Sequence, residues 1–243
     1  MNAVFLSAEW RHLVMLNYPV DPALLEPMLP RGVELEGFAG TTYVSVVGFL
    51  FLRTRVFGVG FPFHRDFEEV NLRFYVRHRA PDGWRRGVVF VRELVPRRII
   101  ATLARLFYSE PYSAFPMSHL VEQEEGKLRC RYAWRRNQKE EFVSAEATGA
   151  PALVAPGSLE EFITEHYWGY NAHRGCTQYQ VEHPPWRVWR ATAAQFEAEV
   201  ATLYGAGFVA PLSEPPASAF IAEGSPVLVR RGSPLPSGAL PVD

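Results

Sequence analysis

Polar and ionisable side chains alternate with apolar ones along one short segment of the sequence. If this segment is a β-strand, its period of two places four polar side chains on one face: Glu69, Asn71, Arg73 and Tyr75. A carboxylate can give or take a proton, and a guanidinium can hold a carboxylate or an enolate. The segment therefore carries the side chains that chemistry on a small organic acid would need.

Glu93 is expected to join this group through a hairpin. The turn Pro81-Asp82-Gly83 separates the segment from a second predicted strand, residues 88–95. With the turn at Asp82, Glu93 falls roughly opposite Asn71 and diagonal to Arg73. The second strand is apolar on both faces, which is typical of a central strand and indicates that the polar face beside it is covered. The pattern alone favours the alternative, an ordinary solvated face of an antiparallel strand.

Other motifs in the sequence predict no chemistry. His64-Arg65-Asp66 and Asn71 fit the spacing of a kinase catalytic loop, but no lysine precedes His64 and no Asp-Phe-Gly follows. No two of the seven histidines are four residues apart, the two cysteines belong to no Cys-x-x-Cys pair, and no Gly-x-Ser-x-Gly elbow is present. We therefore expect no metal and no cofactor. A basic row is predicted to be a solvated strand face: Lys127, Arg129, Arg131 and Arg135.

Composition narrows the class of protein. The 243 residues are 48% hydrophobic and 14% aromatic, which is typical of a folded domain. A formal charge of -1 predicts no binding to nucleic acid. The longest apolar run, residues 44–52, is too short for the ~20 residues of a membrane span, and no signal peptide is evident. The two distant cysteines indicate no disulfide framework. We therefore expect a cytoplasmic protein without a membrane partner.

The elements that must position the polar segment are mostly strands. Alternation predicts strands at 10–18, 33–36, 41–53, 70–77, 88–95, 119–124, 127–135, 142–148 and 227–230. Helices are predicted from Asp21-Pro22 to Pro30, over 96–108, from the capping box at Ser158 to 166, and from 192 to about 205. Residues 1–243 are predicted to form a single, mainly antiparallel β domain, a barrel or sandwich with a few peripheral helices. Residues 232–243 are expected to be a loose tail.

Several segments resemble the YqjF-like proteins, a bacterial family of unknown function in the acetoacetate decarboxylase-like superfamily. They are Trp10-Arg11-His12-Leu13 with Asn17-Tyr18, Val20-Asp21-Pro22-Ala23-Leu24-Leu25, Tyr43-Val44-Ser45-Val46-Val47-Gly48-Phe49, Glu69-x-Asn71-x-Arg73-x-Tyr75-Val76, and Glu110-Pro111-Tyr112. The resemblance covers residues 8–150 well and the remainder loosely. It implies a β-barrel-like fold with helices outside and a pocket inside. It also places Glu69 near the active-site glutamate of the superfamily's decarboxylases.

The departures from that superfamily concern its lysine chemistry. Its decarboxylases use a Schiff-base lysine activated by a second lysine, which the resemblance places near Tyr112, where this chain has none. The arginine that they carry before the Asp-Pro step is replaced by Pro19. Arginine outnumbers lysine 23 to 2, and both Lys127 and Lys139 are expected to be exposed. The sequence therefore predicts no Schiff base.

Three functions stay open at this point. In an enzyme acting on an organic acid or carbonyl compound, Arg73 would anchor the anion and Glu69 would move a proton, with Glu93 as a second acid or base. Asn71, Tyr75 and Tyr112 would contact or orient the substrate. A binder or sensor would use the same pocket without catalysis, and both predict a closed pocket around Arg73. A structural module, including a homo-oligomer, would instead have this face open or against another subunit.

Overall fold

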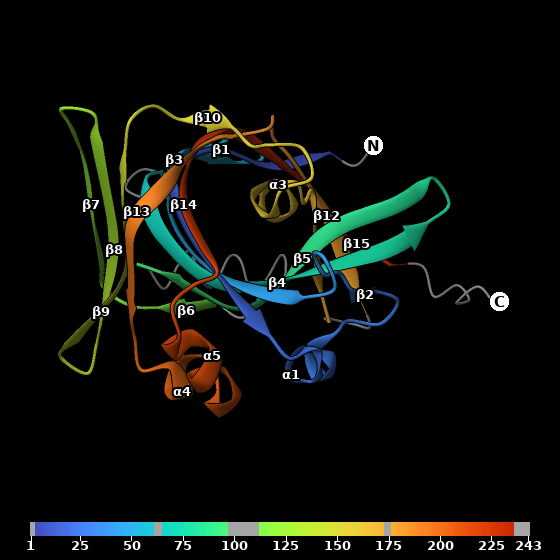
Figure 1. Ribbon diagram of the computed structural model, residues 1–243. Coiled ribbons are helices and arrows are strands. Elements are labelled where there is room, and N and C mark those ends of the chain that lie inside the picture. The colour runs from blue at the N-terminus through green and yellow to red at the C-terminus, as the bar shows by residue number, and fades with distance from the viewer. Residues whose placement is uncertain (1–2, 61–64, 97–111, 173–175, 236–243) are drawn as a thin grey trace.

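The computed structural model describes residues 3–60, 65–96, 112–172 and 176–235, and strands dominate it (Figure 1). The strands are β1 (Val4–Val20), β2 (Glu34–Leu35), β3 (Thr42–Val56), β4 (Phe67–Ala80), β5 (Gly83–Val95), β6 (Tyr112–Ala114), β7 (Met117–Glu124), β8 (Lys127–Arg136), β9 (Lys139–Thr148), β10 (Ala152–Leu153), β11 (Trp168–Asn171), β12 (Thr177–Glu182), β13 (Arg187–Glu197), β14 (Ser218–Arg230) and β15 (Ser233–Pro234). The helices are short: α1 (Pro22–Leu25), η1 (Glu26–Met28), α3 (Leu159–Thr164), α4 (Val200–Leu203), η2 (Ala206–Phe208) and α5 (Val209–Ser213).

All of these strands belong to one sheet, in the order β15-β12-β11-β5-β4-β3-β1-β14-β13-β9-β8-β7, with β2, β6 and β10 paired beside this path. The predicted mainly-β class is confirmed. The antiparallel prediction is only partly right, because β5 pairs in parallel with both β11 and β6. An additional pairing joins β12 to β14, so two strands that lie apart in this order are also neighbours.

The central hairpin forms as predicted. Strand β4 pairs with β5 around the turn, and Asn71 lies directly opposite Glu93. The register shifts between Leu72 and Arg73, which marks a β-bulge beside the polar segment. Strand β5 is central, since β4 lies on one edge and β11 and β6 pair with the other.

Both faces of β4 are covered by apolar side chains. Leu72 and Phe74 belong to a core that also includes residues of β8, β9 and α4. On the opposite face, Tyr75 belongs to a second core with Phe49 and with Phe162 of α3. The polar segment of β4 therefore lies inside the protein.

Two sequence predictions about helices fared differently. The α1 helix begins as predicted, because the side chain of Asp21 accepts a hydrogen bond from the Ala23 backbone N–H at 2.9 Å. The helix predicted from 192 is wrong: β13 continues to Glu197, and only Val200–Leu203 is helical before residue 205. A tertiary contact explains this strand, because residues 191–197 pair with β9 in a long antiparallel ladder. The predicted helix over 96–108 lies almost entirely outside the described residues.

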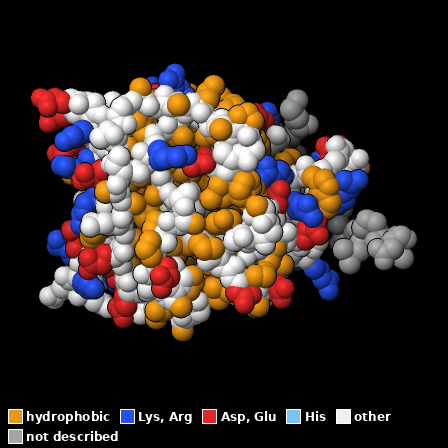
Figure 2. All heavy atoms as spheres, in the orientation of Figure 1, with side chains coloured by type: hydrophobic (Ala, Val, Ile, Leu, Met, Phe, Trp, Pro, Cys, Tyr) orange, Lys and Arg blue, Asp and Glu red, His pale blue; other side chains and the backbone are white. Residues whose placement is uncertain are grey.

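The surface strands carry mixed charge. Figure 2 shows Lys and Arg interspersed with Asp and Glu at the margin where Figure 1 draws β7, β8 and β9. Arg129 pairs with Glu146 at 2.9 Å, and Arg131 pairs with Glu140 at 2.7 Å. The basic row therefore lies on an outer face, as predicted, and neighbouring carboxylates balance its charge. At the C-terminal end, β15 pairs with β12, so the expected loose tail begins with an ordered strand, and residues 236–243 lie outside the described part.

None of the described helices has both the length and the apolar character that crossing a membrane would require.

Candidate functional site

A cluster of two buried carboxyl groups and one buried amide lies where β4 meets β5. Glu69, Asn71 and Glu93 are only 2%, 1% and 2% exposed. Asn71 Nδ2 donates a hydrogen bond to Glu69 Oε1 at 3.0 Å. These residues share one face because of the strand period, and the β4–β5 register brings Glu93 to them. Their burial excludes an open, solvated face.

Tyr112 completes this cluster from the next strand. Strand β6 pairs in parallel with β5, and Tyr112 lies beside Glu93. The Tyr112 hydroxyl makes a long hydrogen bond, 3.5 Å, to Glu69 Oε2 and also interacts with Glu93. Burial, followed by the charges of Glu69 and Glu93, raises the pKa of Tyr112 well above its usual value. The phenol therefore stays protonated and acts as a donor to carboxylates.

Glu69 is the side chain best suited to proton transfer. Burial raises the pKa of Glu69 to about 7, although the hydrogen bonds from Asn71 and Tyr112 and the charge of Arg73 oppose this rise. A carboxyl group with this pKa populates both protonation states at neutral pH. It can therefore act as a general acid or a general base.

Arg73 lies on the same face of β4 and supplies a positive charge to the site. Its Cζ is 5.8 Å from the centre of the Tyr75 ring. Its Nε is buried and has no hydrogen-bond partner among the described residues. Arg77, on the same strand, pairs with Glu34 at 2.8 Å, whereas Arg73 forms no ion pair within the described part of the chain. The Arg73 guanidinium is thus not paired with any carboxylate of the described residues.

Tyr75 is committed to a buried hydrogen-bonded chain. Asn17 Nδ2 donates to Ser218 Oγ at 2.9 Å and to the Ser218 backbone carbonyl at 3.3 Å, which fixes the orientation of the amide. Ser45 Oγ then donates to Asn17 Oδ1 at 2.5 Å, so the Tyr75 hydroxyl must donate to Ser45. Its proton is thereby used within the protein, and the prediction that Tyr75 contacts a substrate stays a prediction.

Three further polar residues adjoin this site and were not selected from the sequence. His166 Nε2 lies 3.1 Å from Glu36 Oε2, and Arg86 Nε donates to Glu36 Oε1 at 2.7 Å. The His166 ring lies 4.7 Å from the Tyr75 ring. Glu36 and His166 are 130 residues apart in the sequence, so no local pattern could have paired them.

The His166 imidazole is neutral. Its side chain is 2% exposed. Burial lowers the pKa of His166 to about 4, although the hydrogen bond to Glu36 opposes this shift and the Arg86 charge adds to it. Burial raises the pKa of Glu36, but hydrogen bonds and charges from His166 and Arg86 outweigh it and hold that pKa below its ordinary value. The pair is therefore a carboxylate and a neutral imidazole.

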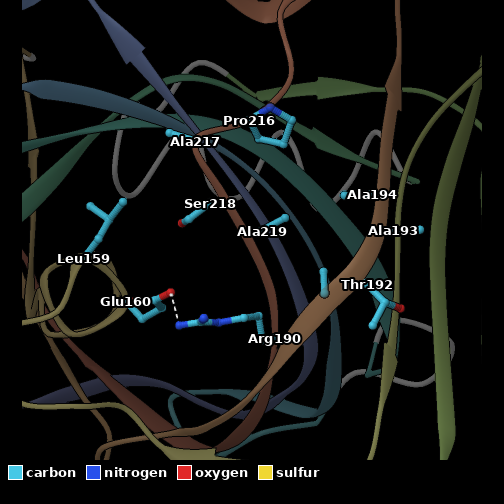
Figure 3. A pocket seen from close by; sticks show the side chains of 11 residues that line it. Leu159, Glu160, Arg190, Thr192, Ala193, Ala194, Pro216, Ala217, Ser218 and Ala219 are labelled. Atoms are coloured by element: carbon cyan, nitrogen blue, oxygen red, sulfur yellow. Dashed lines mark ion pairs between the residues drawn. The ribbon is translucent and has the colours of Figure 1, made fainter.

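A separate hollow lies between the start of α3 and the diverging strands β13 and β14 (Figure 3). It has a volume of about 550 Å³ and is lined mainly by small side chains. Glu160 and Arg190 form an ion pair of 3.6 Å there. None of the sequence-predicted site residues lines this hollow. Ser218 does line it, and the hydrogen bond from Asn17 to Ser218 links the hollow to the hydrogen-bonded chain that ends at Tyr75.

The described residues offer few other reactive groups. No three His, Cys, Asp or Glu side chains among them come together as metal ligands would. Both cysteines are buried, and burial raises the pKa of Cys130 to about 12 and that of Cys176 to about 11. Lys127 and Lys139 are exposed, as predicted, on strands β8 and β9. Neither lysine lies in the buried cluster.

Comparisons with known proteins agree with the resemblance seen in the sequence. The model of the DUF2071 family, described as "Uncharacterized conserved protein", matches residues 7–226. The "Uncharacterized protein YqjF" of Bacillus subtilis (strain 168) is 29% identical over 212 residues, covering 85% of this chain and 83% of that protein.

Solved structures show the same fold at low identity. An acetoacetate decarboxylase from Legionella pneumophila subsp. pneumophila str. Philadelphia 1 is 13% identical with a TM-score of 0.64, covering 95% of this chain and 87% of that one. The enduracididine biosynthesis enzyme MppR complexed with pyruvate is 13% identical with a TM-score of 0.67, covering 96% and 90%. An acetoacetate decarboxylase-like enzyme from Sphingomonas wittichii RW1 is 13% identical with a TM-score of 0.63, covering 96% and 93%. The chain therefore shares the overall fold of acetoacetate decarboxylase-like proteins, as the resemblance predicts.

Proposed function

The chain belongs to the DUF2071 family of uncharacterized conserved proteins, and on this premise we propose that it binds a small organic acid or carbonyl compound beside Arg73. In this proposal Glu69 moves a proton on the bound molecule, and no lysine Schiff base forms. The observation that carries it is a pair of groups on one strand: a guanidinium with no ion-pair partner among the described residues, and a buried carboxyl group with a pKa of about 7.

The two groups have complementary roles. Arg73 holds the carboxylate of the ligand through charge-assisted hydrogen bonds. Glu69, as a carboxylate, takes a proton from the carbon beside the ligand's carbonyl group. The electron pair of that C–H bond forms a carbon–carbon double bond, and the π pair of the carbonyl group moves onto its oxygen. The positive charge of Arg73 stabilises the resulting enolate. The protonated Glu69 then returns the proton.

The surrounding groups support Glu69. Asn71 donates to one of its oxygens and Tyr112 to the other, which fixes the carboxyl group in place. Glu93 lies beside Tyr112 and is a second candidate acid or base. The pairing of β12 with β14 supports the further proposal that the central strands close into a barrel around this site. The MppR enzyme, which shares this fold and has been solved in complex with pyruvate, supports the choice of ligand class.

A thermal-shift experiment with pyruvate tests the binding half of this proposal. A ligand at a hundred times its dissociation constant stabilises the native state by about 2.7 kcal/mol, which is a readily measured rise in Tm. We expect this rise in the wild type and in the control Arg77→Gln, whose arginine already pairs with Glu34. In Arg73→Gln we expect the stabilisation at the same ligand concentration to fall to about 0.4–1.4 kcal/mol, because the loss of charge-assisted hydrogen bonds weakens binding by about 10- to 100-fold. An equal rise in all three proteins contradicts binding at Arg73.

Exchange of pyruvate methyl protons for deuterium in D2O tests the catalytic half. Proton NMR should show the methyl signal fading with the wild type and persisting with Glu69→Gln, while pyruvate still raises the Tm of that variant. If pyruvate binds at Arg73 but the wild type causes no exchange, the protein is the non-catalytic binder. If Glu69→Gln exchanges as fast as the wild type, Glu69 does not carry the proton.

A further inference from the structure

His166 is a buried group that the proposed chemistry does not use. It lies just beyond α3, with its ring 5.0 Å from the Phe162 ring and 4.7 Å from the Tyr75 ring. The guanidinium of Arg73 lies against the same Tyr75 ring, at 5.8 Å. The imidazole and the guanidinium therefore both lie next to Tyr75, in one part of the interior.

Glu36 determines which nitrogen of His166 carries the hydrogen. Glu36 is a carboxylate, held by Arg86 on one oxygen and by His166 Nε2 on the other. A carboxylate only accepts hydrogen bonds, so Nε2 must donate to it. In a neutral imidazole the other nitrogen, Nδ1, then has a lone pair and no hydrogen. His166 thus presents a hydrogen-bond acceptor whose direction Glu36 fixes.

This acceptor has no partner within the described part of the protein. His166 Nδ1 is buried, and no described residue hydrogen-bonds to it. Tyr75, although its ring touches the imidazole, uses its hydroxyl hydrogen on Ser45. Buried polar atoms normally have a partner, and an exception calls for a specific explanation. A ligand that brings its own donor would supply the missing partner.

We propose that His166 Nδ1 accepts a hydrogen bond from a hydroxyl group of the ligand whose carboxylate Arg73 holds. This inference rests on the proposed function and makes the ligand class narrower. A carboxylate for Arg73 and a neighbouring hydroxyl for His166 are together the recognition groups of a 2-hydroxy acid, or of the enol form of a 2-oxo acid. His166 thus determines which organic acids bind, by favouring those that carry a hydroxyl group beside the carboxylate.

Two acids that differ only in the hydroxyl group test the proposal. Lactate and propionate are titrated calorimetrically into the wild type, His166→Phe and the control His78→Phe. Phenylalanine keeps an aromatic ring against Phe162 and Tyr75 but removes the acceptor. His78 is a half-buried histidine on β4 whose Nδ1 lies 2.7 Å from the Gly32 carbonyl oxygen. We expect the wild type and His78→Phe to bind lactate at least about ten-fold more tightly than propionate, and His166→Phe to bind both within about two-fold.

The outcomes separate this inference from the function on which it rests. If lactate and propionate bind the wild type equally at Arg73, or if His166→Phe keeps the preference, the role of His166 is wrong and the anion site remains. If neither acid nor pyruvate binds the wild type, the proposed function fails and the role of His166 fails with it.

An NMR measurement covers the case in which His166→Phe does not fold. In the wild type labelled with 15N-histidine, Nε2 of His166 should be protonated and Nδ1 unprotonated. Lactate should shift the Nδ1 resonance and propionate should leave it in place. A protonated Nδ1 in the free protein overturns the proposal without any ligand.

Discussion

Replacing Glu69 by Gln should raise the stability of the protein relative to the wild type more at alkaline pH than at acid pH. Burial raises the pKa of Glu69 from 4.5 to about 7. A carboxyl group with a raised pKa in the folded state contributes stability below its unfolded pKa and loses that contribution as the pH rises through the folded value. Glutamine cannot ionise, so the variant escapes this loss.

The size of the effect follows from the two pKa values. The difference between 4.5 and about 7 is roughly 2.5 pH units, and each unit corresponds to about 1.4 kcal/mol. Between pH 5 and pH 8.5, the free energy of unfolding of Glu69→Gln relative to the wild type should therefore rise by on the order of 2 to 3 kcal/mol. Any loss from altered hydrogen bonds to Asn71 and Tyr112 is the same at both pH values and cancels in this difference.

Urea unfolding at pH 5 and pH 8.5 measures this difference directly. The matched control is Glu122→Gln on β7, whose side chain is 49% exposed and pairs with Arg129 at 3.6 Å. Its relative stability should change by less than about 0.5 kcal/mol between the two pH values. If Glu69→Gln shows no more pH dependence than this control, Glu69 ionises normally and cannot be the proton carrier that we propose.

Three further predictions concern stability. Burial lowers the pKa of His166 to about 4, so the stability that the neutral imidazole contributes should be lost as the pH falls from 6.5 to 4. In urea unfolding, His166→Phe should therefore lose less stability than the wild type over this pH range. An equally steep decline in the variant would contradict the buried neutral imidazole. Gly87→Ala should lower the free energy of unfolding by about 1–3 kcal/mol, because the added Cβ would lie 2.5 Å from the Trp168 carbonyl oxygen across the parallel β5–β11 pair. An unchanged Tm would argue against that pairing. Asp21→Ala should cost about 1 kcal/mol in the same unfolding assay through loss of the cap on Ala23, whereas no change would mean that the cap contributes nothing.

The local features of the site could be predicted from the sequence. The period of two along β4 and the turn at Asp82 were enough to place Asn71 opposite Glu93, because a hairpin register depends on nearby residues only. The apolar character of β5 also indicated correctly that the polar face of β4 is covered. These inferences needed no knowledge of distant contacts.

The distant contacts could not be predicted in this way. Strands β11 and β12 were not predicted, and β11 pairs in parallel with β5 although the two strands are far apart in the sequence. Residues 191–197 have a weak helical signal, but the ladder with β9 makes them a strand. The contact of His166 with Glu36 likewise depends on how α3 and β2 are brought together in the folded protein. In each case tertiary pairing decides what the local sequence leaves open.

A crystal structure of the protein soaked with pyruvate, or with lactate, tests the central claim most directly. We predict that the ligand's carboxylate lies on the Arg73 guanidinium, with N···O distances of about 2.7–2.9 Å, and that Glu69 faces the neighbouring carbon. A ligand bound only beside Arg190 in the hollow between β13 and β14, or no ligand at concentrations that saturate binding in solution, would contradict an anion site at Arg73.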